Sequence, residues 1–417
     1  MIEADLAVTG IAELATPVGR GPRCGSDQGR LRVVRDAAVA CHAGRIVFVG
    51  PAGELRSAVR LAPSARLVDA AGGTVLPGFV DAHTHLPFAG WREQEFDERL
   101  RGASYSEIAA RGGGILSTVA CTREASEDDL VRSARERLDA MLRLGTTTVE
   151  AKSGYGLSLD GELKQLRALA RAAAGHPLEV VPTVLGAHTL PVEFRERRGD
   201  YLRMLIERLL PEVAGQKLAE YADAFVDAHA FTADEARRVL VAAREHGLGV
   251  RLHADQFADD GAAGLAAELG AASADHLEYA SEEGIEALAR AGTTAVVLPA
   301  VTFFLMLDRC PPARRLIEAG VPVAIATDFN PGSCPTESMG ATLWFAVLSA
   351  RLTVDEAITA ATLNAAHALG RAGSVGSLEP GKRANLVVHD VPNRYHLVYR
   401  FGVPRVARVI VDGRVVD

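Results

Sequence analysis

The chain has 417 residues, of which 48% are apolar and 24% charged, and this ordinary globular composition excludes an intrinsically disordered protein. A net charge of -8 and the lack of a long basic run argue against nucleic-acid binding. No window of about 18 uncharged apolar residues predicts a membrane span, and the acidic first residues predict no secretory signal. A single α/β barrel takes about 250 residues, which leaves room for one further small domain.

The predicted elements change in character along the chain. The first 70 residues carry short strand patterns, such as 45–49, and a turn-rich segment at 19–29. From about residue 75 to 330, apolar β-branched runs alternate with helix-like stretches. The eight runs are 74–81, 146–151, 178–185, 224–228, 249–252, 272–277, 293–298 and 321–326. Residues 375–417 return to short strand patterns separated by turns.

Several of the predicted helices have recognisable ends. Thr232 and Glu235 have the spacing of a capping box, and Gly247 closes the helix that they begin. Similar start signals predict helices after Ser126 and Ser281. The helices therefore fall between the apolar runs, as a βα alternation requires.

Continuous apolar strands with helices between them indicate a parallel sheet, and eight such units predict a (β/α)8 TIM barrel. A doubly wound open sheet is the alternative. It normally has a glycine-rich first turn, whereas residues 80–85 read Val-Asp-Ala-His-Thr-His. We expect the two β-rich chain ends to pair in one small β-sandwich domain. The predicted division is 1–72 and 371–417 for that domain and 73–370 for the barrel.

Polar residues follow four of the predicted strands. His83 and His85 are two residues apart and so share one face, while His253, His276 and Asp328 end the fifth, sixth and eighth strands. Each alone is more simply a hydrogen-bonded structural residue. Together they lie at the end of a barrel where active sites are found. Three imidazoles and a carboxylate suit zinc or iron better than magnesium or calcium, and they can leave a position open for water.

This arrangement resembles the amidohydrolase superfamily, as do the composite terminal domain and the turn Gly-Ser-Leu-Glu-Pro-Gly-Lys-Arg-Ala at 376–384. More specific blocks are similar to the imidazolonepropionase family within it. These blocks are 83–93, 101–105, 112–115, 152–156, 185–188, 273–279, 327–333 and 335–339. They run through the whole predicted barrel, whereas the first 70 residues carry almost none of the resemblance.

The resemblance implies a cytoplasmic hydrolase that opens the cyclic amide of 4-imidazolone-5-propanoate to N-formimino-L-glutamate. It implies one divalent metal, Zn²⁺ or iron, held by His83, His85, His253 and Asp328. It implies catalytic roles for His276, Asp328 and Gln256. The implied substrate-binding residues are Arg92, Tyr155, His188, Gln256, Asn330, Gly332 and Ser333. A small-molecule substrate and a homodimer are also family expectations.

Gln256 stands where many relatives have a glutamate that moves protons. An amide does not exchange protons in this way, so Gln256 would orient the ring and His276 or Asp328 would move the proton. Two-metal relatives usually add a carboxylated lysine on the fourth strand. Residues 225–229 contain no lysine, which favours one metal, and Lys152 is interpreted as part of the substrate loop.

Other interpretations stay open from the residues alone. Arg92 is suited to grip the propionate carboxylate, yet it lies in a region rich in Arg and Glu, where an ordinary surface arginine is the simpler interpretation. Rival functions are another amidohydrolase, acting on a purine, a pyrimidine or formiminoglutamate, and a barrel that keeps its metal only for structure. The run Gly112–Gly114 lacks the Lys-Ser/Thr of a phosphate loop and is interpreted as a lid over the barrel.

The five cysteines are scattered and form no CxxC pair. Reduced thiols in a cytoplasmic protein are therefore expected, rather than a disulfide framework or a thiolate metal site.

Overall fold

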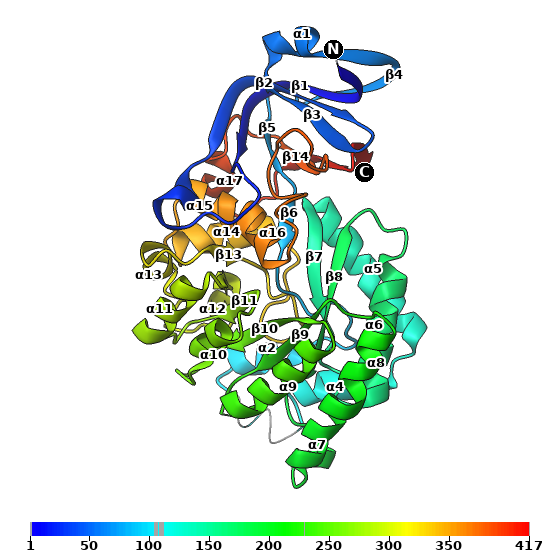
Figure 1. Cartoon of the computed structure of the whole chain (residues 1–417), viewed down its shortest axis with the longest axis vertical. Coiled ribbons are helices and arrows are strands. Elements are labelled where there is room, and N and C mark those ends of the chain that lie inside the picture. Colours follow the sequence, from blue (N-terminus) through cyan, green and yellow to red (C-terminus); the bar gives the residue numbers. More distant parts are fainter. Residues whose placement is uncertain (1, 104–106, 108–111, 229, 417) are drawn as a thin grey trace.

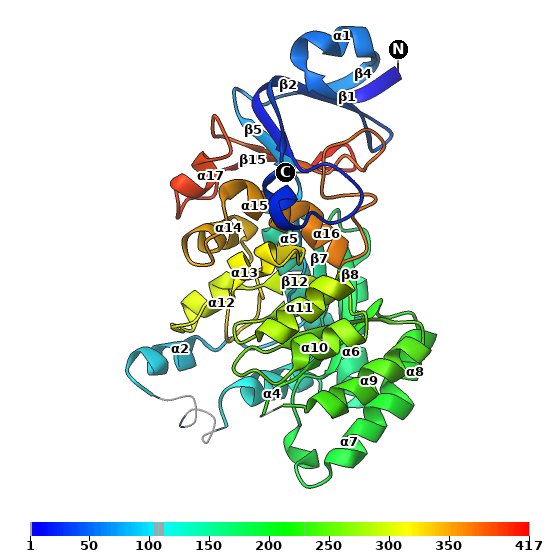
Figure 2. The same ribbon diagram turned by 60° about the vertical axis from the view of Figure 1, so that its left-hand side comes forward.

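The computed structural model describes residues 2–103, 107, 112–228 and 230–416. It contains two parts, a strand barrel ringed by helices and a sheet that joins both ends of the chain (Figure 1). The views in Figures 1 and 2 agree that this sheet caps one end of the barrel, with α2 and α4 toward the other end.

The barrel has eight parallel strands in sequence order around one sheet, which confirms the predicted (β/α)8 fold. They are β6 (Phe79–Asp81), β7 (Thr146–Lys152), β8 (Glu179–Ala187), β9 (Tyr221–Phe225), β10 (Gly249–Ala254), β11 (Ser273–His276), β12 (Thr294–Val297) and β13 (Val323–Ile325). The first and last strands meet just beyond their ends, where the Asp328 amide donates to the His83 carbonyl at 3.0 Å. The closing contact of the barrel therefore joins two of the predicted site residues.

Helices surround the barrel strands. They are α2 (Glu93–Leu100), α4 (Ile115–Glu124), α5 (Glu127–Arg143), α6 (Leu159–Ala173), α7 (Arg198–Met204), α8 (Leu210–Gly215), α9 (Ala233–Glu245), α10 (Ala262–Glu268), α11 (Glu282–Ala291), α12 (Pro299–Phe304), α13 (Ala313–Glu318), α14 (Met339–Leu348), α15 (Val354–Thr359) and α16 (Ala365–Ala368). The capping box predicted at Thr232 and Glu235 is present with both of its hydrogen bonds at the start of α9. Ser126 and Ser281 also cap α5 and α11 as expected.

The terminal sheet combines strands from both chain ends. Its strands are β1 (Ile2–Thr16), β2 (Arg32–His42), β3 (Arg45–Pro51), β4 (Val59–Asp69), β5 (Thr74–Pro77), β14 (Leu386–His389), β15 (Val406–Val411) and β16 (Arg414–Val416). β1 pairs with β2, β4 and β5, and β14 joins the C-terminal strands to β5. The expectation that the two ends fold together is confirmed, and the short helices α1 (Leu55–Ala58) and α17 (His396–Tyr399) belong to these end segments.

The run 74–81 was predicted as one barrel strand, but the structure divides it between the two sheets. β5 belongs to the terminal sheet and β6 to the barrel, with Gly78 between them. A Cβ atom on Gly78 would overlap the side chain of Thr147, so the crossing depends on a residue without a side chain. Apolar periodicity does not register this change of sheet because both halves are buried.

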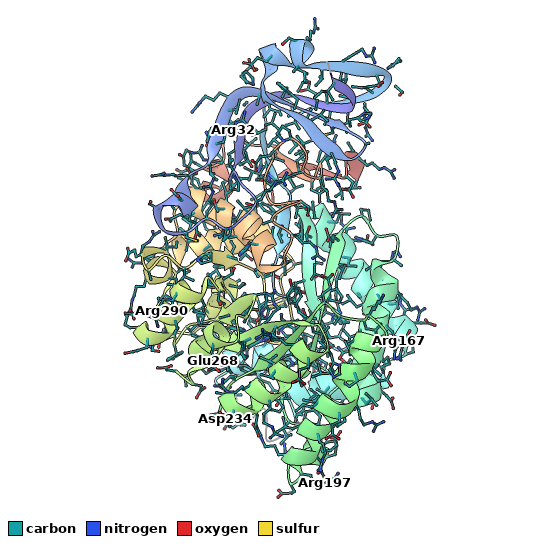
Figure 3. The ribbon with its side chains drawn as sticks, viewed as in Figure 1. Arg32, Arg167, Arg197, Asp234, Glu268 and Arg290 are labelled. Atoms are coloured by element: carbon teal, nitrogen blue, oxygen red, sulfur yellow. The ribbon has the colours of Figure 1, made fainter. Side chains whose placement is uncertain are left out.

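Figure 3 labels charged side chains at the periphery of the molecule, among them Arg167, Arg197 and Arg290. Arg167 on α6, which that figure labels, pairs with Glu127 at the start of α5 at 3.0 Å. Within the described ranges, no helix is long and apolar enough to cross a membrane.

Candidate active site

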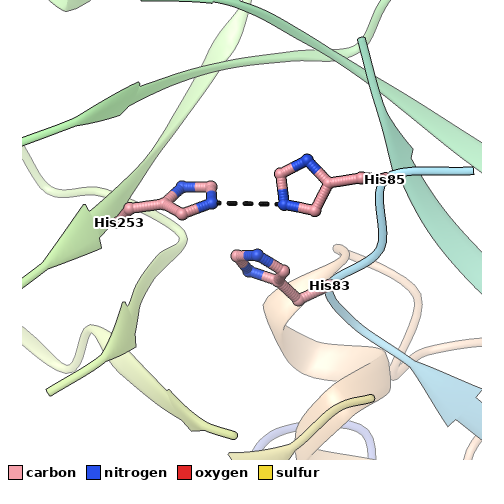
Figure 4. A group of neighbouring side chains, drawn as sticks. All are labelled: His83, His85 and His253. Atoms are coloured by element: carbon pink, nitrogen blue, oxygen red, sulfur yellow. Dashed lines mark hydrogen bonds between the residues drawn. The ribbon is translucent and has the colours of Figure 1, made fainter. Parts of the chain in front are cut away.

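Three imidazoles meet at the carboxyl end of the barrel strands (Figure 4). Nε2 of His85 lies 3.4 Å from Nε2 of His253 and 3.4 Å from Oδ1 of Asp328. The same Asp328 oxygen lies 3.4 Å from Nε2 of His83. All four side chains are buried, and His83 Nε2 has no hydrogen-bond partner among the described residues. A divalent metal fits this donor set, since it would satisfy the otherwise unpaired nitrogen.

Two buried aspartates lie behind these imidazoles. Nδ1 of His83 lies 2.6 Å from Asp275, and Nδ1 of His253 lies 3.0 Å from Asp223. A proton held on Nδ1 by a carboxylate leaves the Nε2 lone pair free and fixes the direction of the ring. Asp275 therefore selects for His83 the tautomer that a metal ligand needs, while Asp223 lies at ion-pair distance from His253.

Two buried cations compensate these carboxylates inside the barrel. Lys152 Nζ lies 2.8 Å from Glu150 and 3.1 Å from Asp223, while Arg251 lies 3.4 Å from Asp275. Burial acts to lower the pKa of Lys152, but the neighbouring Glu150 and Asp223 outweigh it and raise that pKa. The interpretation of Lys152 as part of the substrate loop is wrong, because its side chain is fully buried among these carboxylates.

His276 and Asp328 have left-handed backbones, with φ values of 79° and 53°. Residues other than glycine rarely adopt this conformation, and those that do cluster at functional sites. Donor atoms of both residues and of His83 lie within 4.8 Å of one another. Burial lowers the pKa of His276 to about 3, so its imidazole is neutral near pH 7.

Glu278 is a buried acid that sequence reasoning did not single out for a role. Its Oε2 lies 3.9 Å from Nδ1 of His276, and neither carboxyl oxygen has a hydrogen-bond partner among the described residues. Burial raises the pKa of Glu278 to about 8. Burial therefore disfavours the charged form of this carboxyl group beside His276.

Tyr155, His188 and Arg92 border the metal-binding cluster. The His188 ring stacks on His85 with centroids 5.1 Å apart, and its Nδ1 lies 2.9 Å from the carbonyl of Gly154. Burial and the nearby His85 lower the pKa of His188 to about 3, so it is a neutral donor and acceptor. The Tyr155 ring lies 5.4 Å from His188. Burial raises the pKa of Tyr155, and the charge of the neighbouring Arg92 acts against that rise.

Asn330, Gly332 and Ser333 form a turn after Asp328. Oδ1 of Asn330 accepts hydrogen bonds from the amides of Gly332 and Ser333, both at 2.8 Å. The Ser333 hydroxyl donates to Oδ2 of Asp328 at 3.2 Å. This turn positions the Asp328 carboxylate, while contact of its residues with a substrate stays a prediction.

The remaining predicted positions are Gln256, the run Gly112–Gly114 and the block 101–105. Gln256 follows β10 and is 7% exposed, and its role toward a ring stays a prediction. The amide of Gly114 donates to Glu95 on α2 at 3.0 Å, so the Gly112–Gly114 run contacts that helix. The role of this run as a lid over the barrel stays a prediction. Ser104 and Tyr105 of the block 101–105 lie outside the described residues.

The sequence contains a pattern from which the buried charged residues behind the histidines could have been predicted. Arg251 precedes His253 by two positions on β10 and so faces the same side, and Asp275 directly precedes His276. A charged residue inside an apolar barrel strand that ends in a histidine is therefore a candidate for supporting the histidines of the site.

Comparison with known proteins agrees with this geometry. The amidohydrolase family model matches residues 74–416. The imidazolonepropionase of Symbiobacterium thermophilum is 50% identical over 417 residues, covering 100% of this chain and 98% of the relative. This chain belongs to the imidazolonepropionase family of amidohydrolases. Its Geobacillus kaustophilus relative of the same name is 50% identical over 388 residues, 93% of this chain and 91% of that protein.

A solved zinc-bound adenosine deaminase from Xanthomonas campestris has a similar fold, with a TM-score of 0.74. The two chains are 22% identical, and the match covers 99% of this imidazolonepropionase family member and 93% of the deaminase. At that identity the likeness supports the barrel and terminal sheet, and the full-length relatives carry the family assignment.

Proposed function

We propose that this hydrolase opens the ring of 4-imidazolone-5-propanoate to give N-formimino-L-glutamate, a carbon–nitrogen bond cleavage in histidine breakdown. The observation that carries the proposal is the 50% identity, over the whole chain, to a protein named imidazolonepropionase. The site supports it, since a buried set of imidazoles and a carboxylate lies beside neutral and cationic groups suited to a small anionic ring.

His83, His85, His253 and Asp328 would hold one divalent metal, Zn²⁺ or iron. Such a metal supplies Lewis acidity, which makes water nucleophilic near neutral pH and polarises a carbonyl. One metal is favoured because β9 contains no lysine and Lys152 is paired with carboxylates.

His276 would move the proton in the reaction. As the water oxygen bonds to the ring carbonyl carbon, the neutral imidazole accepts the proton that the water loses. The imidazolium formed then stabilises the negative oxygen and returns the proton to the ring nitrogen when the carbon–nitrogen bond breaks. Asp328 is the alternative carrier, and Gln256 would orient the ring because its amide does not exchange protons.

Arg92 would bind the propionate carboxylate, with Tyr155 and His188 contacting the ring and its substituents. The guanidinium group is suited to two parallel hydrogen bonds with a carboxylate. Asn330, Gly332 and Ser333 would contact the substrate or product, in part through their backbones.

The test is the ultraviolet disappearance of 4-imidazolone-5-propanoate with purified protein, before and after chelation. Rapid loss that chelation abolishes, with formation of formiminoglutamate, is the expected result. Release of ammonia from a purine or pyrimidine would instead favour a deaminase, and metal-loaded protein without any turnover would favour a structural role for the metal.

We also propose a homodimer working in the cytoplasm. The five cysteines are all free, as expected in a reducing compartment. Exposed apolar side chains on three neighbouring segments offer a surface for a second copy: Phe303, Leu348, Tyr399 and Phe401. Light scattering during size-exclusion chromatography would give about twice the 44.1 kDa chain mass if this is correct.

A further inference from the structure

A second arginine lies beside Arg92 at the mouth of the barrel. Helix α2 carries Arg99, whose Nη2 donates to the Gly332 carbonyl at 3.4 Å. The Arg92 guanidinium lies against the α-carbon of the same glycine, where any Cβ atom would overlap it. Two guanidinium groups from the segment 92–99 therefore meet at Gly332, four residues after the metal ligand Asp328 in the chain.

Two aromatic rings hold the Arg99 side chain in this place. Phe96 on α2 stacks on Phe304 of α12, with ring centroids 4.9 Å apart and an interplanar angle of 16°. The Arg99 guanidinium carbon lies 5.8 Å from the first centroid and 5.6 Å from the second. Cation–π contacts at this distance fix the direction of a guanidinium group without neutralising its charge. Arg99 is therefore aimed at the loop that follows Asp328.

Neither arginine has an acidic partner at ion-pair distance among the described residues, and Nε of Arg92 is buried without a hydrogen-bond partner. By contrast, Arg101 at the end of the same helix lies 2.8 Å from Asp97 and has a 77% exposed side chain. Desolvation and the positive charge of Arg92 lower the pKa of Arg99. The carboxylate of Glu95 acts against that lowering, but it accepts hydrogen bonds from Gly114 and Ser117 and forms no ion pair with either arginine among the described residues. Two adjacent, partly buried cations repel each other, and an anion between them would reduce that cost.

We propose that Arg92 and Arg99 together form an anion site over Gly332, and that this site binds the carboxylate of the substrate's propionate side chain. The inference rests on the proposed function and deepens it, because it makes α2 a recognition element. A carboxylate has two oxygens and about four acceptor directions, enough for donors from both guanidinium groups. The metal-binding cluster would then hold the ring while this site holds the side chain.

The experiment compares Arg99→Met with Arg101→Met, two loss-of-charge variants at the same end of α2. Methionine keeps an apolar contact with the Phe96 and Phe304 rings, so α2 should stay docked. We expect Arg99→Met to raise KM for 4-imidazolone-5-propanoate by about tenfold or more while kcat changes less than about threefold. Arg101→Met should leave both constants at the wild-type values.

Binding without turnover gives the second measurement. Calorimetry with imidazole-4-propanoate should show weaker binding to Arg99→Met by the same factor as KM. Its neutral amide, imidazole-4-propanamide, should bind the wild type and Arg99→Met equally, because no charge is there to recognise. Arg99→Lys should restore part of the loss, since it keeps the charge but not the planar fork.

The outcomes separate the two proposals. If the wild type turns over the substrate and Arg99→Met behaves like Arg101→Met, the anion site is wrong and Arg99 only packs α2 against α12. If Arg99→Met weakens the acid and the amide equally, its role is packing rather than charge recognition, and the inference fails. If the wild type does not turn over the substrate, the proposed function fails, and the assignment of this site to that substrate fails with it.

Discussion

Buried residues behind the imidazoles would orient the proposed metal ligands. Lys152 lies between Glu150 and Asp223, and Asp223 in turn lies against His253. Removing one partner from a buried ion pair leaves an uncompensated charge, at a cost of about 3–5 kcal/mol. The ligand geometry would change with it, because Asp223 would lose the cation that holds it in place.

We therefore predict that Lys152→Met weakens metal binding by about 10–100-fold and lowers thermal stability. The matched control is Lys164→Met on α6, which removes a lysine that donates to three backbone carbonyls at the end of α4 and contacts none of the clustered histidines. Metal content after dialysis against graded chelator concentrations measures the effect directly. Equal metal affinity in the two variants would show that Lys152 supports the barrel but not the site.

A second residue-scale prediction separates proton transfer from ring orientation. His276→Asn should lower kcat by about 10²–10⁴-fold with little change in metal content, because asparagine forms hydrogen bonds but does not carry a proton. Gln256→Ala should mainly raise KM, since the amide is expected to orient the ring. Steady-state kinetics with parallel metal analysis distinguishes the two, and a larger kcat loss in Gln256→Ala would move the proton carrier away from His276.

At the scale of elements, α9 tests whether a local sequence signal carries stability independently of the site. The Thr232 hydroxyl oxygen accepts a hydrogen bond from the Glu235 amide, and the Glu235 carboxylate accepts one from the Thr232 amide. Thr232→Ala should lower the free energy of unfolding by about 1 kcal/mol, because an N-terminal amide loses its partner. Arg238→Ala on the exposed side of the same helix should change it by less than about 0.5 kcal/mol.

Urea unfolding of both variants provides the measurement, and kcat of the folded protein should not change in either. A Thr232→Ala variant as stable as Arg238→Ala would mean that water replaces the cap at no cost.

Strands and helix caps were predicted well where they depend on residues that are neighbours in the sequence. Each of the eight apolar runs overlaps one barrel strand and the cap at Thr232 formed, because each depends on residues close together in sequence. The division of 74–81 at Gly78 could not be predicted in this way, since it depends on Thr147 in another strand. Arg99 was missed for the same reason, as its contacts come from α12 and from the loop at Gly332.

At the scale of the whole molecule, the terminal sheet meets the barrel where the chain passes from β5 to β6. β14 lies between β5 and β15, so strands from both ends meet directly above the barrel. The division at 72/73 and 370/371 stays a prediction, and the place of β5 in the terminal sheet would move its first boundary a few residues along the chain. Because β5 of the terminal sheet continues through Gly78 into β6 of the barrel, we expect a group buried at their junction to affect the stability of the whole chain.

His389 is such a group, at the end of β14. It is 2% exposed, neither ring nitrogen has a hydrogen-bond partner among the described residues, and its ring lies 5.8 Å from Phe79 at the start of β6. Burial lowers the pKa of His389 from 6.5 to about 4. Below pH 6.5 the unfolded chain takes up a proton that folded His389 does not bind, so unfolding becomes more favourable as the pH falls toward 4.

We predict that this histidine costs the wild type up to about 3 kcal/mol of stability between pH 6.5 and 4, from 2.5 pKa units at 1.36 kcal/mol each. His389→Leu removes the titration and keeps an apolar side chain at the junction, so its free energy of unfolding should fall less over the same range. Urea unfolding of both chelated proteins at several pH values measures the difference between their free energies of unfolding. The contributions of all other titrating groups cancel in this difference because both proteins contain them. A difference that does not change with pH would mean that His389 is protonated or hydrated in the folded protein, and the junction would then admit water.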